Sequence, residues 1–476
     1  MPQSERTVES LRKKLRRQEA GSQIAARQQG VLGDIHLQRM ADRLGDTRVQ
    51  SVQRQTMARR LGRVLGSRHL HRLVTFMRPS RAMSPTARVD MIQRFDAYEH
   101  AQIAEQAGPG GVTIKGVQLT LGDINALGDL YDTVDDLLNA DPDELKQLVA
   151  LIRKQKADPE SVTDTDWEKA TAGRPEGKRY IDLARKNAPH YGPSNPAMVP
   201  PQAGTAAGQD HRAQWEAYHR RALGLAQQAA NTSDESEKQQ LMDQATIINA
   251  FGDHFLADAF ASGHLFNKDD VMNLARKQVT QLTPEELTKL FKVVADRVFA
   301  QHKDTISKYE VKGGPLAGIW WPNLNSASRF SSLLAGIYEE EPGVVYGAIV
   351  KAVHDHLNKQ GFEVSNKKAT WTLVGDLELA NSPDTQKWLQ TAIQQTRANL
   401  TEASKPNQCV DPAALVGFVT QYVPEPTEKS AAMVKEMVEK MTDPKGGMAT
   451  ELTAVINQTL PTILQTLVRM GKIRLA

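Results

Sequence analysis

The sequence is poor in cysteine and in aromatic residues, and it has no long apolar run. Cys409 is its only cysteine, so an intrachain disulfide and a thiolate metal cluster are both excluded. No stretch reaches the roughly 18 uncharged apolar residues that a membrane-spanning helix needs. Residues 12–17 include five basic side chains with no apolar run after them, so we expect no Sec-type signal peptide. Any bound metal must therefore rely on His, Asp and Glu.

Positive charge is concentrated in the first part of the chain. Residues 1–90 contain 19 Lys and Arg against 7 Asp and Glu, whereas residues 91–476 contain 40 against 49. The resulting charges of +12 and −9 predict a basic arm, residues 1–86, in front of a mildly acidic body. Because the arm has few apolar residues, we expect it to be flexible or docked on a partner.

Helical periodicity dominates the rest of the sequence. We expect helices at 87–107, 120–138, 143–155, 208–230, 235–262, 284–309, 326–338, 343–360, 383–402, 412–423 and 427–470. Alternating apolar residues at 112–120 and 369–374 predict minor β-hairpins. The sequence thus predicts an all-α bundle, with a helical domain at 87–380 and a C-terminal helical extension at 381–476.

The most informative motif has the spacing His-x3-Asp-x5-His. His254 and Asp258 lie four residues apart on an expected helix and so project from one face. The dipeptide Ser262-Gly263 can end the helix and fold His264 back toward them. Two imidazoles and a carboxylate suit a divalent ion such as zinc. The alternative is a buried structural helix whose His and Asp are satisfied by hydrogen bonds.

This motif resembles the central helix of the α-helical zinc-dependent phospholipase C and single-strand nuclease family. Three upstream segments, which contain His100, Asp129 and His190, resemble the family's other ligand-bearing segments in the same order. The resemblance covers residues 87–380 and implies two or three zinc ions. It also implies that Asp129 bridges two ions and orients the attacking water. The metal ligands that the resemblance implies are His100, Asp129, His190, His254, Asp258 and His264.

The resemblance is looser downstream of the central helix. The family has a His-x3-carboxylate pair there, and the matching positions are His354 and Asn358. We take His354 as a metal ligand. Asn358 is a poorer ligand than a carboxylate, so Asp355 or His356 is an alternative. A third ion is expected only if the arm is removed. Among the remaining histidines, the charged surroundings of three predict surface positions: His211, His219 and His302.

A site of this kind suits hydrolysis of phosphodiesters or phosphomonoesters. A phospholipid is the expected substrate, because the acidic body offers nucleic acid no general attraction. Trp320-Trp321 could insert into a lipid interface or stack on a base, although a Trp pair beside proline more often packs internally. Phe255, Phe260, Leu265 and Phe266 are expected to supply an apolar lip. A single-strand nuclease and a non-catalytic component of a secretion particle are the alternatives.

The arm carries two short related segments, around Leu44-Gly45 and Leu65-Gly66. They are similar to the N-terminal leaders of toxins loaded into contractile injection systems. This resemblance implies a toxin that is cytoplasmic in the producing cell and is exported without a Sec signal to act outside it or in a target cell. Residues 1–80 would then bind the particle's tube or a chaperone. The alternative is a basic disordered tail that binds nucleic acid or membrane nonspecifically.

Overall fold

The computed structural model describes residues 97–476 with six gaps. The gaps are 203–207, 313–319, 322–323, 376–377, 408–409 and 470. All the described residues belong to one compact unit, Pro85–Ala476. The expected arm, its repeat and the part of the first expected helix before Ala97 lie outside the described residues.

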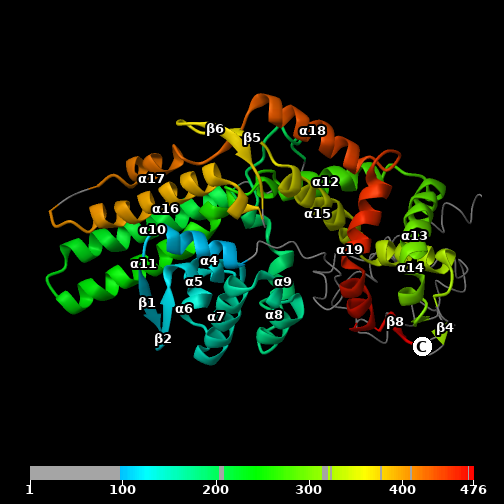
Figure 1. The fold of residues 1–476 in the computed structure, drawn as a ribbon, viewed down its shortest axis with the longest axis horizontal. Coiled ribbons are helices and arrows are strands. Elements are labelled where there is room, and N and C mark those ends of the chain that lie inside the picture. The colour runs from blue at the N-terminus through cyan, green and yellow to red at the C-terminus, as the bar shows by residue number, and fades with distance from the viewer. Residues whose placement is uncertain are drawn as a thin grey trace, which may run out of the picture. The chain divides into compact units, whose positions relative to one another are not determined.

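The described part of the chain is predominantly helical, which confirms the expected all-α class (Figure 1). Its longer helices are α4 (Ala97–Gln106), α5 (Leu121–Ala126), α6 (Val134–Leu138), α7 (Pro142–Ala157), α8 (Asp164–Ala170), α9 (Tyr180–Arg185), α10 (His211–Asn231), α11 (Glu235–Asp258), α12 (Lys268–Val279), α13 (Pro284–Ile306), α14 (Ala327–Glu340), α15 (Gly343–Gln360), α16 (Pro383–Ala403), α17 (Pro412–Thr420), α18 (Glu428–Thr442) and α19 (Met448–Arg469). The short 3₁₀ helices are η1 (Leu127–Asp129), η2 (Pro159–Ser161), η3 (Ala188–His190), η4 (Ser262–His264) and η5 (Leu379–Asn381).

The strands form three small antiparallel sheets. The first is the hairpin of β1 (Gly111–Ile114) and β2 (Val117–Thr120). The second has the order β4-β3-β8, and the third has the order β6-β5-β7. Their strands are β3 (Tyr309–Lys312), β4 (Trp320–Trp321), β5 (Phe362–Ser365), β6 (Thr370–Leu373), β7 (Glu425–Pro426) and β8 (Ile473–Leu475). The two expected strand regions are present as the β1–β2 hairpin and β6. The sequence did not predict β3, β4, β5, β7 and β8, which have two to four residues each, and a run this short carries little alternation.

The first hairpin shows why its sequence favours a turn. Lys115 and Gly116 both have positive φ angles, 45° and 79°. A two-residue turn with two positive φ angles matches the right-handed twist of the flanking strands, and glycine adopts such angles at little cost. The single expected stretch at 112–120 is therefore two strands.

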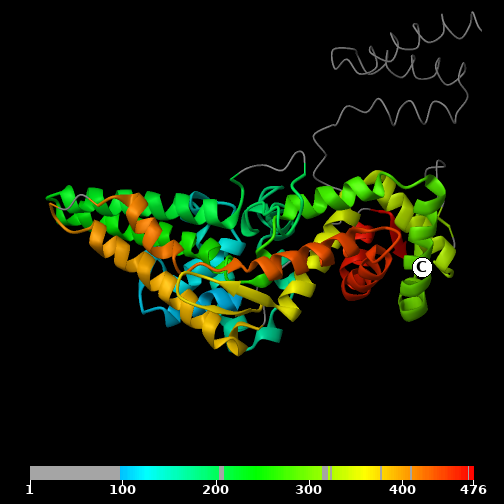
Figure 2. The same ribbon diagram turned by 90° about the horizontal axis from the view of Figure 1, so that it is seen from above.

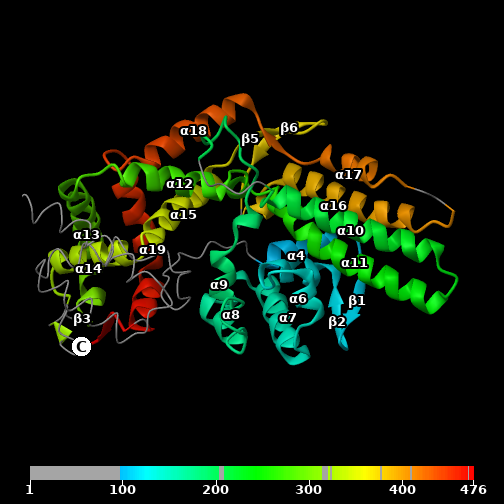
Figure 3. The ribbon, with the colours of Figure 1, turned by 180° about the vertical axis from the view of Figure 1, so that it is seen from behind.

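Helices α10 and α11 pack side by side as a long antiparallel hairpin (Figures 1 and 3). Asp234 caps α11 by accepting hydrogen bonds from the backbone amides of Ser236 and Glu237. The second half of α11 is buried on every side from Ile247 to Asp258. Helices α5 and α16 pack against it. A helix that is covered all round places any polar side chain it carries inside the core.

One expected helix is broken in the structure. The stretch 120–138 contains α5, η1 and α6 rather than a continuous helix. A Cβ atom at Gly128 would lie 2.3 Å from Cγ of His254, so the backbone passes against that imidazole at a distance that only glycine permits. Thr133 then starts α6 by accepting a hydrogen bond from the amide of Asp136. The break is thus tied to the close approach of η1 to α11.

The helices after residue 381 belong to the same compact unit as the helices before it. Helix α16 packs against α10 and α11, and α19 packs against α13 and α15 (Figure 2). The strand β8 near the C-terminus pairs with β3. Residues 381–476, expected as an extension, therefore contribute to the packing of the whole unit. None of the described helices is long and apolar enough to cross a membrane.

The central position of α11 predicts a large loss of stability when its core is truncated. Phe251 is fully buried, whereas Phe418 on α17 is 53% exposed. We expect Phe251→Ala to lower the free energy of unfolding by about 3–5 kcal/mol, because it removes buried apolar surface and leaves a cavity. The control Phe418→Ala should change it by less than about 0.5 kcal/mol. Urea unfolding of the two variants measures the difference, and equal losses would contradict this picture of the core.

Candidate metal centre

Six of the predicted ligands come together near the end of α11. They are His100 on α4, Asp129 at the end of η1, His190 at the end of η3, His254 and Asp258 in the last turns of α11, and His264 at the end of η4. His100, His254 and Asp258 are completely buried. Four other segments fold toward the end of α11 and bring together side chains that lie far apart in the sequence.

Three of these side chains form a tight group. Nδ1 of His190 lies 3.0 Å from Oδ2 of Asp258 and 3.0 Å from Nε2 of His254. The His254 nitrogen lies 3.6 Å from the same Asp258 oxygen. Ligands bonded to zinc at about 2.0–2.1 Å in a tetrahedron lie about 3.4 Å from one another. The separations within the group bracket that value, so the donor set fits a divalent ion.

A second group shares His254 with the first. In the part of the chain that the structure describes, the ligand atoms of His100, Asp129 and His254 also lie within 4.8 Å of one another. Oδ1 of Asp129 is 3.6 Å from Nε2 of His254, and Nε2 of His100 is 3.7 Å from Oδ1 of Asp258. The two groups are therefore parts of one cluster of three imidazoles and two carboxylates, the ligand types that zinc accepts.

His264 lies beside the cluster and points its Nδ1 elsewhere. Nδ1 lies 2.8 Å from the backbone oxygen of His190, to which it donates, and 3.5 Å from Oδ1 of Asp258. A nitrogen that donates a hydrogen bond cannot also bind a metal. The ring stacks on Tyr191, with centroids 5.1 Å apart and planes at 2°, and its centroid lies 5.0 Å from that of the tilted His354 ring. The predicted triad of His254, Asp258 and His264 converges. Nδ1 of His264 holds the backbone oxygen of His190, which leaves the lone pair on its other ring nitrogen, Nε2.

Asn125 supports the cluster and was not predicted. Its Oδ1 lies 3.1 Å from Nδ1 of His100, so that nitrogen carries the proton and Nε2 presents its lone pair to the cluster. The residue is fully buried on α5. Only the fold could reveal it, because a buried Asn on a short helix has no distinguishing sequence pattern.

The cluster's imidazoles are held in the neutral form. Burial lowers the pKa of His100 to about 3, against an opposing effect of the Asn125 hydrogen bond. Burial also lowers the pKa of His190, and it lowers that of His254 further with the help of neighbouring His100. Neutral imidazole is the form that binds a metal, so these side chains are prepared for one at neutral pH.

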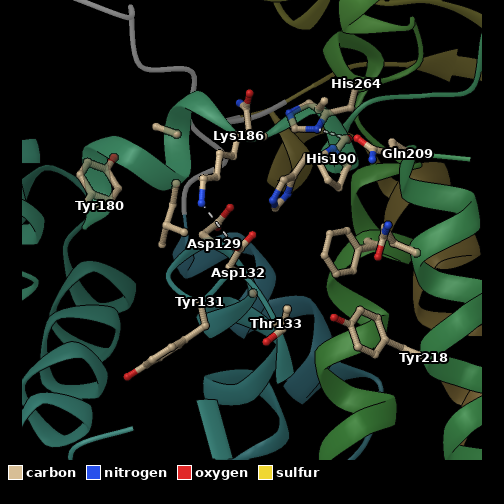
Figure 4. Close-up of a pocket in the computed structure, with 18 residues that line it drawn as sticks. Asp129, Tyr131, Asp132, Thr133, Tyr180, Lys186, His190, Gln209, Tyr218 and His264 are labelled. Carbon is tan, nitrogen blue, oxygen red and sulfur yellow. Dashed lines mark hydrogen bonds and ion pairs between the residues drawn. The ribbon is translucent and has the colours of Figure 1, made fainter. Parts of the chain in front are cut away.

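A cavity of about 520 Å³ opens beside the cluster (Figure 4). Asp129, His190 and His264 are among the residues that line it. Lys186 extends toward Asp129 and Asp132, and its Nζ lies 3.5 Å from Oδ2 of Asp132. The other lining side chains are mostly aromatic or apolar and include Tyr131, Tyr180, Leu183, Pro189, Tyr218 and Phe255.

Lys186 was not singled out from the sequence. It is the single Lys or Arg among the described residues that line the cavity. Its side chain is half exposed and also donates to the backbone oxygen of Gly177 at 3.0 Å. A lone cation next to a metal cluster is placed to neutralise charge on a bound anion.

Two expectations about histidines are wrong. His211 and His219 were expected on the surface, yet they are 3% and 1% exposed. His219 lies between Oδ1 of Asn249, at 2.7 Å, and Nδ2 of Asn399, at 3.1 Å. Helix α16 covers this face of α10, and charged neighbours in sequence gave no sign of that cover. His302 is partly exposed.

Comparisons with protein-family models, with curated proteins and with solved structures find no match to the chain. The interpretation of the site therefore depends on its own geometry and donor chemistry.

Asn125→Ala should weaken metal binding. The change removes the acceptor that fixes the tautomer and ring orientation of His100, and losses of such supporting partners typically cost about 10- to 100-fold in affinity. Titration against a competing chelator measures the change. Asn139→Ala is the control, because the exposed side chain of Asn139 donates to the backbone oxygen of Asp135 on its own helix and is not among the cluster residues. Equal affinity in the Asn125 variant and the wild type would argue against a metal in this cluster.

The metal-free protein should lose stability as the pH falls below 6.5. Burial lowers the pKa of His100 and His211 to about 3 and that of His219 to about 4, whereas it raises the pKa of Asp253 to about 7. Unfolding in acid therefore takes up three protons at these histidines and releases one at Asp253. At these four groups the net uptake is two protons, which is a loss of about 3 kcal/mol per pH unit between pH 6.5 and 4, and the lowered pKa values of His190 and His254 add to it. Urea unfolding in chelator at several pH values measures it, and constant stability would contradict the burial of neutral histidines.

Proposed function

We propose that the chain is a metal-dependent phosphoester hydrolase that acts on phospholipids in the manner of a phospholipase C. The observation that carries the proposal is the largely buried cluster beside a cavity, formed by His100, Asp129, His190, His254 and Asp258. Zinc is the proposed metal, because imidazoles and carboxylates at these separations suit its tetrahedral coordination. The family resemblance in the sequence supports the same choice.

Each side chain at the site has a distinct proposed role. A divalent ion bound by the cluster would polarise a phosphoryl oxygen and lower the pKa of a water molecule. His190, His254 and Asp258 would hold the ion. Asp129 is 19% exposed and faces the cavity, so its carboxylate can accept a hydrogen bond from the attacking water and orient it. Lys186 would neutralise charge on the phosphate as the ester bond breaks.

The cavity wall supports a lipid substrate over a long polynucleotide. Among the described lining residues Lys186 is the single cation, whereas single-strand binders use a basic track along the backbone. The apolar lip expected from the sequence is only partly present. All four residues are buried, and of them Phe255 lines the cavity, whereas Phe260, Leu265 and Phe266 are not among its lining residues. The side chains of Trp320-Trp321 lie outside the described residues.

A nuclease is the second candidate. Tyr180 and Tyr218 line the cavity and offer rings on which a base could stack. The non-catalytic alternative predicts no metal in the cluster at all. Export as a toxin or effector of a contractile injection or other secretion system, with residues 1–80 binding its tube or chaperone, stays a proposal that rests on the sequence of the arm.

The decisive experiment compares metal content and substrate hydrolysis in matched variants. After reconstitution with zinc, the wild type should retain bound metal and release phosphorylated head groups from phospholipid vesicles faster than it cuts single-stranded DNA. His254→Ala and Asp258→Ala should lose metal from the cluster and lose hydrolysis, because each removes a ligand. His302→Ala is the control and should behave as the wild type.

Each possible result decides between the candidates. Cleavage of DNA without lipid turnover would favour the nuclease. Bound metal with activity on neither substrate would reject both hydrolases, and a wild type without bound metal would favour the non-catalytic component. Full activity in either ligand variant would reject the cluster as the catalytic site.

A further inference from the structure

The end of α15 packs against η4 through a chain of hydrogen bonds. The backbone amide of Gly263 donates to Oδ1 of Asn358 at 2.6 Å. Nδ2 of Asn358 lies 3.2 Å from Nε2 of His354, and Nδ1 of His354 lies 3.1 Å from Oδ1 of Asp355. Asp355 in turn accepts from Nζ of Lys351 at 2.7 Å. These contacts surround the positions where the family resemblance implies a further metal ion.

The direction of the hydrogen bonds follows from the Gly263 amide. Because that amide can only donate, it fixes Oδ1 of Asn358 as the acceptor and turns Nδ2 toward His354. An amide N–H can only donate, so Nε2 of His354 must accept it. The proton of His354 then sits on Nδ1, where Asp355 accepts it. The lone pair that would bind a metal is thus engaged by Asn358.

The space around Asn358 is closely filled. A Cβ atom at Gly375 would lie 1.7 Å from Oδ1 of Asn358, and one at Gly263 would lie 2.3 Å from it. The backbone amide of Gly375 donates to the backbone oxygen of Asn358 at 3.1 Å. Two glycines are therefore needed to admit this side chain, which is 7% exposed. Its position is set by the packing on both sides.

The same contacts position η4 relative to the metal cluster. Oγ of Ser262 donates to the backbone oxygen of Leu357 at 2.8 Å, next to the Gly263–Asn358 contact. His264 follows directly and holds the backbone oxygen of His190 with its Nδ1. The ring of His190 carries one of the cluster's ligand nitrogens. Asn358 thus lies at the start of a short path of contacts that ends at a ligand.

We propose that Asn358 closes the second metal position and acts as a positioning residue, so that His264 and His354 form a metal-free support for the cluster. This inference rests on the proposed function for the ion in the cluster, and it changes the expected number of ions in the protein. The carboxylate that would complete a site with His264 and His354 is replaced by an amide whose N–H occupies the His354 lone pair.

Metal counting tests the closed position. Zinc-reconstituted wild type and His354→Ala should contain equal metal equivalents by elemental analysis, and so should the control His356→Ala on the same helix. Asn358→Asp should gain one equivalent, because a carboxylate accepts from Gly263 as the amide does and leaves the His354 nitrogen to a metal. Loss of an equivalent in His354→Ala alone would overturn the proposal, as would failure of Asn358→Asp to gain one.

A spectroscopic measurement keeps the test independent of the proposed function. In the full chain, ¹⁵N NMR of the His354 ring should report a proton on Nδ1 both with zinc and after chelation. A zinc-dependent change of Nε2 of His354 from a hydrogen-bond acceptor to a metal-bound nitrogen would overturn the proposal. If the wild type binds no metal, the proposed function fails while the NMR result still decides the state of His354.

The positioning role has its own readout. Asn358→Ala should weaken zinc binding at the cluster by about 10-fold or more, as for other supporting partners, without changing the number of ions bound. Asn358→Asp should retain the cluster affinity, because it preserves the acceptor for Gly263. If Asn358→Ala binds zinc at the cluster as tightly as the wild type does, Asn358 contributes to packing alone and its positioning role is overturned. If Asn358→Ala does not fold, Gly375→Ala replaces it, since the added Cβ displaces the same amide.

Discussion

The structure depends on the burial of His254 and Asp258 in the core at the end of α11. Both side chains are completely excluded from solvent. An uncompensated charge at such a position is costly, so the fold must supply neutral partners, hydrogen bonds or a metal ion. Three imidazoles, held neutral by the same burial, and the Asp129 carboxylate gather there. The neighbouring polar side chains therefore allow the end of α11 to be buried in the core.

The close packing around α11 explains the irregular segments that surround it. The chain leaves helical geometry at η1, where Gly128 passes against the His254 ring. It does so again near Gly192, where a Cβ atom would lie 2.7 Å from the backbone oxygen of Leu265. The first turn lies beside His254 of the cluster, and the second lies beside Leu265, which follows His264. Short 3₁₀ segments thus deliver side chains that a regular helix would direct elsewhere.

The sequence predicted the parts of the site that are local and missed those that depend on distant packing. The four-residue spacing of His254 and Asp258 fixes a shared helix face before any tertiary structure is known. The resemblance then identified His100, Asp129 and His190, which the structure brings into the same cluster. The cover that α16 gives to His219 could not be predicted, because charged neighbours along a helix say nothing about what packs on its other faces.

Asn358 illustrates how one residue can carry opposite meanings in sequence and in structure. In the sequence, Asn358 stands where the family has a carboxylate ligand, and this favours the alternative of a non-catalytic protein. In the structure it contacts Gly263 and His354, while the ligand atoms of His190, His254 and Asp258 form their group without it. The contact of Asn358 with Gly263 therefore positions η4 beside the cluster, whereas the exchange of a carboxylate for an amide at residue 358 bears on the second position. The absence of a carboxylate there leaves the donor set of the cluster intact, and the case for metal binding rests on that donor set.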